Sequence, residues 1–219
     1  MNFLKKLFGT KEAKKEFTDE DFQNHYEEKS VGLEKVLGKS HDIVGHAIIP
    51  FEIGGAVDMY YYPNGIQGTG FATMELIKPD GNGPKPNRLG TYELVGFTKH
   101  NYNSDETETT DFNKIERRLC GIFTGIGNYS FMAKLEPGET CEFPGEENEP
   151  NKCILFDNYE PEGKQFYIGN KKHGLLLTME ILKDEMEFAR QNGSGKLIEK
   201  LKEKGVFPYS DLDRNSVLN

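Results

Sequence analysis

The stretch AVDMYYY, residues 56–62, decides the fold class, because its side chains alternate with the period of a β-strand. Every second residue of a strand points to the same face. The two faces are Val57, Met59 and Tyr61 on one side, and Asp58, Tyr60 and Tyr62 on the other. A turn signal, PNG, follows at residues 63–65. The segment therefore predicts a strand that ends in a turn.

Strand patterns recur along the chain on both sides of this stretch. They lie at residues 46–51, 66–78, 91–98, 153–157, 165–168 and 173–179. A turn-rich loop, PDGNGPKPN, separates two of them at residues 79–87, and loops are also expected at residues 101–112 and 137–151. Neighbouring strands with short links favour an antiparallel sheet.

A helix is expected over residues 18–37, before the first strand. Thr18 is its predicted N-cap, accepting a hydrogen bond from the backbone N–H of Asp21, and Gly38 is the predicted stop. The apolar stripe, which includes the aliphatic stem of a lysine, consists of Phe22, Tyr26, Lys29, Leu33, Val36 and Leu37. Such an amphipathic helix must pack its stripe against another element.

Further helical patterns complete the domain. One stripe runs through residues 115–126, and a helical pair that breaks at residues 193–195 begins at Asp184. The sequence therefore predicts an α+β fold, in which a mixed, largely antiparallel sheet is flanked by helices. Since no linker divides the chain, residues 18–219 are expected to form one domain.

The first 17 residues, MNFLKKLFGTKEAKKEF, form a basic amphipathic leader. Its apolar residues are Phe3, Leu4, Leu7 and Phe8, and its lysines are Lys5, Lys6, Lys11, Lys14 and Lys15. The apolar run is far too short for a signal-peptide core. Two interpretations stay open: a frayed or disordered leader before the fold, or contact of residues 1–16 with an anionic membrane surface or a partner groove.

Composition and charge exclude several classes of protein. The 219 residues carry 27 Lys and Arg against 36 Asp and Glu, which gives a formal net charge of −9. Because an acidic chain repels phosphate backbones, nucleic acid is not an expected partner. No stretch approaches the ~20 apolar residues of a membrane span. The three cysteines form no C-x-x-C pair and are odd in number, which indicates reduced thiols in a cytoplasmic protein.

No motif in the chain predicts catalysis, a cofactor or a metal. The glycines at residues 65–70 and 121–127 lack the strand-before-helix context of a phosphate-binding loop. Gly193-Ser194-Gly195 is the nearest sequence to a nucleophile elbow, but it is typical of a helix-breaking turn. The histidines and cysteines lack zinc-site spacing. A pair of carboxylates for acid–base chemistry has no recognisable signature among so many acidic residues.

The charge distribution points to a protein partner. Between residues 136 and 162 the chain has nine acidic residues and one basic residue. Such a concentrated negative field attracts a positively charged protein. The candidate partner-binding residues are Asp58, Tyr60 and Tyr62 on the strand, and Glu146, Glu147 and Glu149 in the acidic segment. The alternatives are that the first three lie on a sheet face covered by a helix, and that the acidic segment only aids solubility.

The serial order of several segments resembles that of the suppressor-of-fused domain family. The segments are VDMYYYPNG and GTGFATMEL within residues 56–77, TYELVGFT at 91–98, GETCEFPG at 138–145, CILF at 153–156, GLLLTMEILKDEMEFARQNGSGKLIEKL at 174–201 and SDLDRNSV at 210–217. The residues that fit the family's spacing in its helical pair are Glu185, Ala189, Gly193, Leu197 and Leu201. Asp211 and Arg214 match the D-x-x-R pattern with which the family's sequence ends. The likeness covers roughly residues 20–219 and is closest to the bacterial, single-domain type.

The resemblance implies a non-catalytic protein-binding domain. The animal member sequesters a zinc-finger transcription factor by gripping a short segment as an added strand, and bacterial members are thought to serve as immunity proteins in polymorphic toxin systems. An exposed sheet edge can bind an extended peptide through main-chain hydrogen bonds. We therefore expect an immunity-type protein that neutralises a cognate toxin, with a basic toxin domain as its partner.

Two other functions remain open on the sequence. One is a small hydrolase with an unrecognised carboxylate site, which requires a pocket lined by acids with perturbed pKa values. The other is a membrane-surface adaptor that uses residues 1–16.

Overall fold

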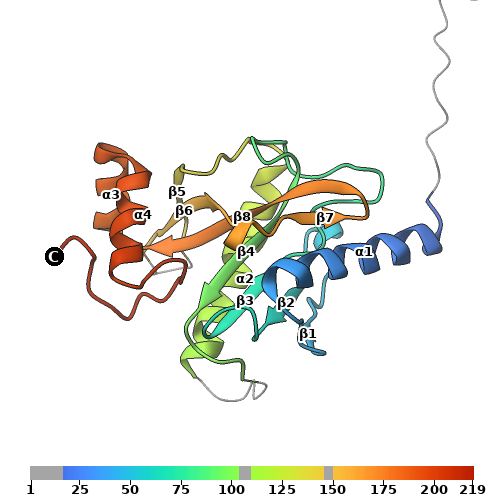
Figure 1. Cartoon of the computed structure of the whole chain (residues 1–219), viewed down its shortest axis with the longest axis horizontal. Coiled ribbons are helices and arrows are strands. Elements are labelled where there is room, and N and C mark those ends of the chain that lie inside the picture. The colour runs from blue at the N-terminus through green and yellow to red at the C-terminus, as the bar shows by residue number, and fades with distance from the viewer. Residues whose placement is uncertain (1–16, 104–109, 146–149) are drawn as a thin grey trace, which may run out of the picture.

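The computed structural model describes residues 17–103, 110–145 and 150–219. Its elements are α1 (Asp19–Leu37), β1 (Val44–Gly45), η2 (Phe51–Ile53), β2 (Met59–Tyr62), β3 (Thr69–Ala72), β4 (Tyr92–Thr98), α2 (Asp111–Ser130), β5 (Thr140–Phe143), β6 (Lys152–Asn158), η3 (Pro161–Gly163), β7 (Phe166–Ile168), β8 (Lys171–Ile181), α3 (Lys183–Asn192) and α4 (Ser194–Glu203). The predicted α+β fold is confirmed. Figure 1 shows α1 and the α3–α4 pair at opposite ends of the molecule.

The sheet is mixed and largely antiparallel, as predicted. Its strand order is β1-β2-β3-β4-β8-β6-β5, and β7 pairs with the first residues of β8. The pairing of β4 with β8 is parallel, whereas the other named strands pair antiparallel. The long connection between β4 and β8 carries α2, β5, β6 and β7.

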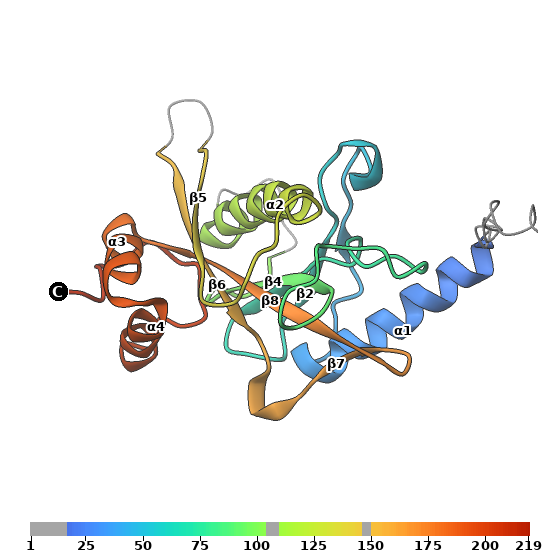
Figure 2. The ribbon, with the colours of Figure 1, turned by 90° about the horizontal axis from the view of Figure 1, so that it is seen from above.

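Two hydrophobic cores lie on the two faces of the sheet. The predicted alternation in β2 is confirmed, because Tyr60 and Tyr62 enter the core shared with α1, α3 and α4. Met59 and Tyr61 enter the core shared with α2. In Figure 2 the sheet accordingly lies between α2 on one side and α1 on the other. The helices thus cover both faces, as expected for side chains that are apolar on both sides of a strand.

Helix α1 begins and ends where the sequence predicts. The backbone N–H of Asp21 donates to Thr18 Oγ1 at 3.2 Å, and the Thr18 N–H donates to the Asp21 carboxylate at 2.9 Å, which forms a capping box. Gly38 follows with a φ of +87°, which favours glycine. Gly32 lets the helix approach β7, since a Cβ there would lie 1.9 Å from the carbonyl oxygen of Tyr167.

Residues 46–51 do not form the predicted strand. The chain pairs only briefly through β1 and then turns through η2, where Gly55 donates its N–H to the Pro50 carbonyl at 3.0 Å. Pro50 has no N–H for a sheet ladder. Ile48 and Ile49 are exposed whereas Phe51 is buried, so this segment is a surface loop anchored by one aromatic side chain rather than a buried strand.

The acidic segment at residues 137–151 contains strand β5, where a loop was predicted. Cys141 and Phe143 turn toward α2 and pack against its core, while Glu142 lies outside and pairs with Lys183 at 2.8 Å. Gly125 makes room on α2, because a Cβ there would lie 2.0 Å from the Phe143 ring. Strand β5 therefore depends on a contact with α2, which is a separate element earlier in the chain. The local sequence of β5 does not reveal this contact.

Asp211 and Arg214, which match the family pattern, attach the C-terminal segment to the rest of the fold. Arg214 donates to both carboxylate oxygens of Glu185, at 2.6 and 2.8 Å, and the pair is largely buried. The Asp211 carboxylate accepts hydrogen bonds from Thr98 Oγ1 at 2.5 Å and from the Lys99 N–H at 2.9 Å. These contacts fasten the end of the chain to α3 and to β4, so both residues have a structural role.

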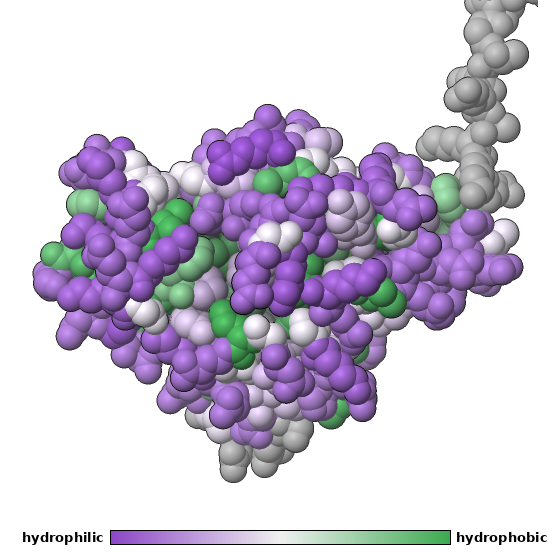
Figure 3. Space-filling model, viewed as in Figure 1, coloured by the Kyte–Doolittle hydropathy of each residue, from purple (hydrophilic) through white to green (hydrophobic). Residues whose placement is uncertain are grey.

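Residues 1–16 of the predicted leader lie outside the described residues. Among the helices that the structure describes, none has both the length and the apolar content of a membrane span. Figure 3 shows one face of the molecule as mainly hydrophilic, with apolar side chains in small, separate patches.

Candidate functional site

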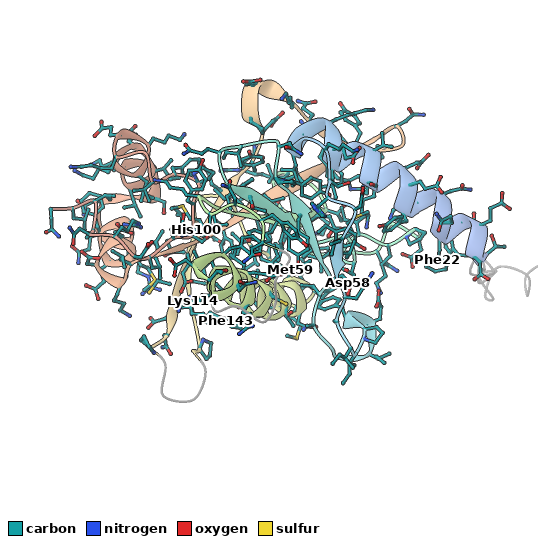
Figure 4. All side chains as sticks on the ribbon, turned by 90° about the horizontal axis from the view of Figure 1, so that it is seen from below. Phe22, Asp58, Met59, His100, Lys114 and Phe143 are labelled. Carbon is teal, nitrogen blue, oxygen red and sulfur yellow. The ribbon has the colours of Figure 1, made fainter. Side chains whose placement is uncertain are left out.

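A groove of about 660 Å³ opens between the N-terminal half of α1, the loop that carries η2, and the chain that follows β3. Its lining residues are Asp19, Phe22, Gln23, His25, Tyr26, Lys29, Glu52, Asp58, Tyr60, Met74, Glu75, Ile77, Lys78 and Pro79. In Figure 4, Phe22 on α1 and Asp58 beside β2 lie on the same side of the molecule. The groove therefore combines aromatic side chains with carboxylates.

A buried ion pair supports the floor of this groove. Lys29 of α1 and Glu93 of β4 are 1% and 0% exposed, and the Lys29 Nζ donates to Glu93 Oε1 at 2.8 Å. The same ammonium donates to the carbonyl oxygens of Met74 and Ile77, each at 2.6 Å. All three N–H bonds of the ammonium thus have a partner, which buried charge requires.

The Glu93 carboxylate also draws the chain after β3 out of the sheet. It accepts hydrogen bonds from Thr73 Oγ1 at 2.7 Å, from the Leu76 N–H at 3.3 Å and from the Ile77 N–H at 2.9 Å. Because these N–H groups bond to a side chain instead of a neighbouring strand, the strand predicted over residues 66–78 ends at Ala72. The resulting loop places Glu75 in the groove.

Glu75 is held at the groove by two backbone hydrogen bonds. Its carboxylate accepts from the Asp58 N–H at 3.1 Å and from the Met74 N–H at 3.0 Å. Burial, followed by the nearby charge of Glu93, raises the pKa of Glu75 to about 8, although the two backbone donors act in the opposite direction. Glu75 is therefore mainly protonated at neutral pH.

Asp58 joins the groove to the loop before η2. Its Oδ2 lies 2.7 Å from His46 Nδ1, and its Oδ1 accepts from the Ala47 N–H at 2.9 Å. The side chain remains partly exposed. Asp58 thus lies directly before β2, and its carboxylate fixes a surface loop.

Aromatic side chains form the wall on the α1 side. Phe22 and Tyr26 belong to the predicted apolar stripe, but they are 54% and 41% exposed, whereas Leu33 in the second half of the helix is buried. The Tyr26 and Tyr60 rings lie 6.2 Å apart between centroids. The apolar stripe of α1 therefore extends beyond the core on which the helix packs. In the first two turns of the helix, the aromatic side chains of Phe22 and Tyr26 are left accessible to a ligand.

The six residues predicted to bind a partner fall into three groups. Asp58 and Tyr60 line the groove. Tyr62 is 1% exposed and lies in the core under α1, so its ring offers no surface to a partner in this structure. Glu146, Glu147 and Glu149 lie outside the described residues. Partner binding by all six residues stays a prediction. Of the three at the strand, Asp58 is partly exposed and Tyr60 is 9% exposed.

Sequence reasoning missed Glu75 and Glu93, which organise the groove. A signal for the second was present, because Glu93 is the one charged residue in the apolar strand TYELVGFT and Lys29 is the one charged residue in the apolar stripe of α1. Opposite charges on two apolar faces indicate a buried pair. Nothing comparable marks Glu75, whose place depends on the hydrogen bonds around it.

Beyond the groove, the described residues offer little chemistry. They contain no group of three or more His, Cys, Asp or Glu side chains placed to hold a metal ion. Cys120, Cys141 and Cys153 are free thiols, and burial raises the pKa of each. A raised thiol pKa disfavours the reactive thiolate. The groove, by contrast, presents an apolar and acidic surface.

This chain belongs to the suppressor of fused protein (SUFU) family, as the resemblance in its sequence indicated: the family's sequence model matches residues 70–215, more than half of the chain. The family is known for protein interaction and is not known for catalysis. Among curated proteins, none matches this sequence.

Solved structures support the same fold. A chain of the Sufu–Fu complex crystal structure is similar with a TM-score of 0.58 and 12% identity, covering 90% of this chain and 92% of that chain. A SUFU homolog from Neisseria gonorrhoeae is similar with a TM-score of 0.57 and 13% identity, covering 89% of this chain and 97% of that chain. The structural similarity establishes the fold, but sequence identities of 12% and 13% are too low to assign a function.

Proposed function

We propose that this chain is a non-catalytic, cytoplasmic protein-binding domain that receives its partner at the groove between α1 and the chain after β3. We further propose that it is an immunity-type protein, which neutralises a cognate toxin by direct binding. The observation that carries the proposal is the open aromatic surface of Phe22 and Tyr26 beside the carboxylates of Asp58 and Glu75. Aromatic side chains in a sheltered setting are the residue types that most often anchor a protein partner.

The scaffold supports this proposal because it fixes the groove before a partner arrives. Lys29 and Glu93 hold the helix and the loop together from beneath, so little conformational entropy remains to be lost on binding. The Sufu–Fu complex shows that a chain of this fold takes part in a protein complex. The net charge of −9 favours a basic partner, which is the chemistry expected of the toxin domain.

Co-expression tests the proposal directly. Products of the genes adjacent to this one are expressed in a sensitive host, alone and together with this chain, and growth is measured. We expect that one of these products arrests growth and that the wild-type chain restores it. Asp58→Lys, which reverses a charge in the groove, should abolish protection, whereas Glu199→Lys on the exposed face of α4 should retain it. Protection that survives Asp58→Lys contradicts the groove as the binding site.

One observation favours a second function. Asp58 and Glu75 both line the groove, and after burial and the charge of Glu93, the charge of Asp58 is one of the causes that raise the pKa of Glu75 to about 8. A protonated acid beside a second carboxylate is the arrangement of a hydrolase acid–base pair. A hydrolytic activity that Glu75→Gln abolishes without loss of folding supports this alternative and contradicts the non-catalytic proposal.

A further inference from the structure

We propose that the groove receives a single cationic side chain, arginine or lysine, from the partner protein, with Asp58 and Glu75 as its acceptors and Tyr26 and Tyr60 as its aromatic neighbours. The inference rests on the proposed function, since it names the chemistry of the partner at the same groove. It also predicts a property that the general proposal lacks, namely the release of a proton on binding.

The charges of the groove favour a cation. Its acidic lining residues are Asp19, Glu52, Asp58 and Glu75, and its two lysines are Lys29 and Lys78. Both lysines are already committed, because Lys29 pairs with Glu93 at 2.8 Å and Lys78 lies 3.8 Å from Glu52. Asp58 and Glu75 therefore have no lysine or arginine partner among the described residues of the groove, and its acidic lining would repel an anionic ligand even while Glu75 is protonated.

The two carboxylates retain acceptor capacity on the groove side. A carboxylate offers about four lone-pair sites. Asp58 uses its oxygens for His46 and Ala47, and Glu75 uses its oxygens for two backbone N–H groups. Each side chain thus has further sites, and both line the groove. A guanidinium carries five N–H donors in a planar fork, which suits two carboxyl groups in one groove better than a neutral side chain does.

The aromatic residues fit the same ligand. Tyr26 and Tyr60 both line the groove, with ring centroids 6.2 Å apart. A cation within about 6 Å of a tyrosine ring is attracted by the electrons of the ring face. Phe22, which is exposed at the outer end of the groove, can cover the aliphatic stem of an arginine or lysine. Acidic and aromatic neighbours together select a long cationic side chain over a metal ion or a purely apolar one.

Glu75 couples this binding to a proton. Because its pKa is about 8 in the free groove, Glu75 is mainly neutral at pH 7, and a bound cation favours its ionised form. The groups that act electrostatically on Glu75 are Glu93 of β4, Asp58 directly before β2, Tyr60 of β2 and Cys120 of α2. The other ionisable groups that line the groove are Asp19, His25, Tyr26 and Lys29 of α1, Glu52 of η2 and Lys78 of the loop after β3. Binding at pH 7 should therefore release a proton, and affinity should rise with pH.

The test uses the full chain and a defined probe, the tripeptide acetyl-Gly-Arg-Gly-amide. Its neutral control is the same peptide with citrulline, which keeps the shape of arginine without the charge. Methyl NMR spectra report binding, because Met74 and Ile77 line the groove while the exposed Met132 lies outside it. We expect the arginine peptide to shift the Met74 and Ile77 methyl signals, and the citrulline peptide to leave them unchanged.

The pH dependence distinguishes this site from nonspecific attraction to an acidic protein. We expect affinity for the arginine peptide to rise about tenfold or more between pH 6 and pH 9. Glu75→Gln should remove this rise and weaken binding at pH 9 by about tenfold, the loss of one charge-assisted hydrogen bond. Glu199→Gln, which removes an exposed carboxylate on α4, should change neither quantity.

Three results overturn the inference. Two of them contradict a cation site: equal binding of the arginine and citrulline peptides, and absence of any shift at Met74 and Ile77 with or without the leader lysines. The third, binding that appears only after the leader lysines are changed to glutamine, contradicts the partner as the source of the cation. The last result assigns the groove to the chain's own leader, whose lysines are Lys5, Lys6, Lys11, Lys14 and Lys15. If the peptide fails while Asp58→Lys still abolishes protection from the toxin, the cation inference falls and the proposed function stands.

Discussion

Replacement of Lys29 by methionine removes the charge that supports the groove and keeps a similar side-chain length. The change leaves the Glu93 carboxylate buried without its cation, and it leaves the carbonyl oxygens of Met74 and Ile77 without the ammonium donor. Loss of one partner from a buried pair destabilises a protein by about 3–5 kcal/mol. Whole domains are stable by only about 5–15 kcal/mol, so this loss takes a large part of the total.

The structure also provides a matched control. Lys114 pairs with Asp111 at 2.9 Å on the surface of α2, where both side chains are exposed. Lys114→Met therefore deletes the same kind of charge pair in water, and we expect almost no change in stability. For a chain of this size each kcal/mol shifts Tm by about 2–4 °C. Lys29→Met should thus lower Tm by roughly 6–20 °C, and Lys114→Met by no more than about 2 °C.

Chemical and thermal denaturation of both variants measure these changes. A third variant, Lys29→Met with Glu93→Gln, removes both charges, and the double-mutant cycle then gives the coupling between them. We expect the double variant to be more stable than the sum of the two single losses allows. If Lys29→Met and Lys114→Met lose the same stability, or if the cycle shows no coupling, the pair does not support the groove as argued.

Three further predictions concern buried polar groups elsewhere in the fold. Arg214→Leu leaves Glu185 unpaired and should destabilise the protein by about 3–5 kcal/mol; a loss below about 1 kcal/mol in urea denaturation contradicts the C-terminal fastening. Burial lowers the pKa of His173 to about 4 from 6.5, so the unfolded chain binds more protons between these values and stability falls as pH drops from 6.5 toward 4. His173→Gln should flatten this part of the profile, and an unchanged slope refutes the assignment. Burial raises the pKa of Glu75 to about 8 from 4.5, so the folded chain binds more protons and stability falls as pH rises through this range. Glu75→Gln should remove that decline, and a variant that declines as wild type does shows that another group is responsible.

The elements that the sequence predicted correctly are those with local causes. Helix α1 begins at a capping box and ends at a glycine, and both signals lie within a few residues of the boundary they set. Strand β2 alternates between two cores, so the period of its side chains is enough to assign both faces. The family resemblance added the remaining order of elements, which no single motif provides.

The features that the sequence did not predict depend on distant contacts. Strand β3 ends early because the Glu93 carboxylate takes the N–H groups of Leu76 and Ile77, and β5 forms because Phe143 packs beside Gly125 of α2. Each cause lies in a different element from its effect. A local pattern therefore cannot separate a true strand from a loop in these two segments.

The groove shows the same limit for function. An apolar stripe predicts a buried helix face. It does not reveal that the core covers only the second half of α1 and leaves Phe22 and Tyr26 exposed. The alternation that correctly placed Tyr62 opposite Tyr61 could not tell which tyrosines remain at the surface. The exposure of a side chain depends on which other elements pack over it, and those contacts form only in the folded chain.

The central claim is that the groove beside α1 binds a protein, and site-specific photocross-linking in native cells tests it most directly. A benzophenone amino acid replaces Phe22 at the open end of the groove, and in a separate variant it replaces Glu199 on the exposed face of α4. We predict that the probe at position 22 forms a cross-link to one defined polypeptide, that Asp58→Lys abolishes it, and that position 199 gives none. The same cross-linked partner at both positions, or none at position 22, contradicts the account.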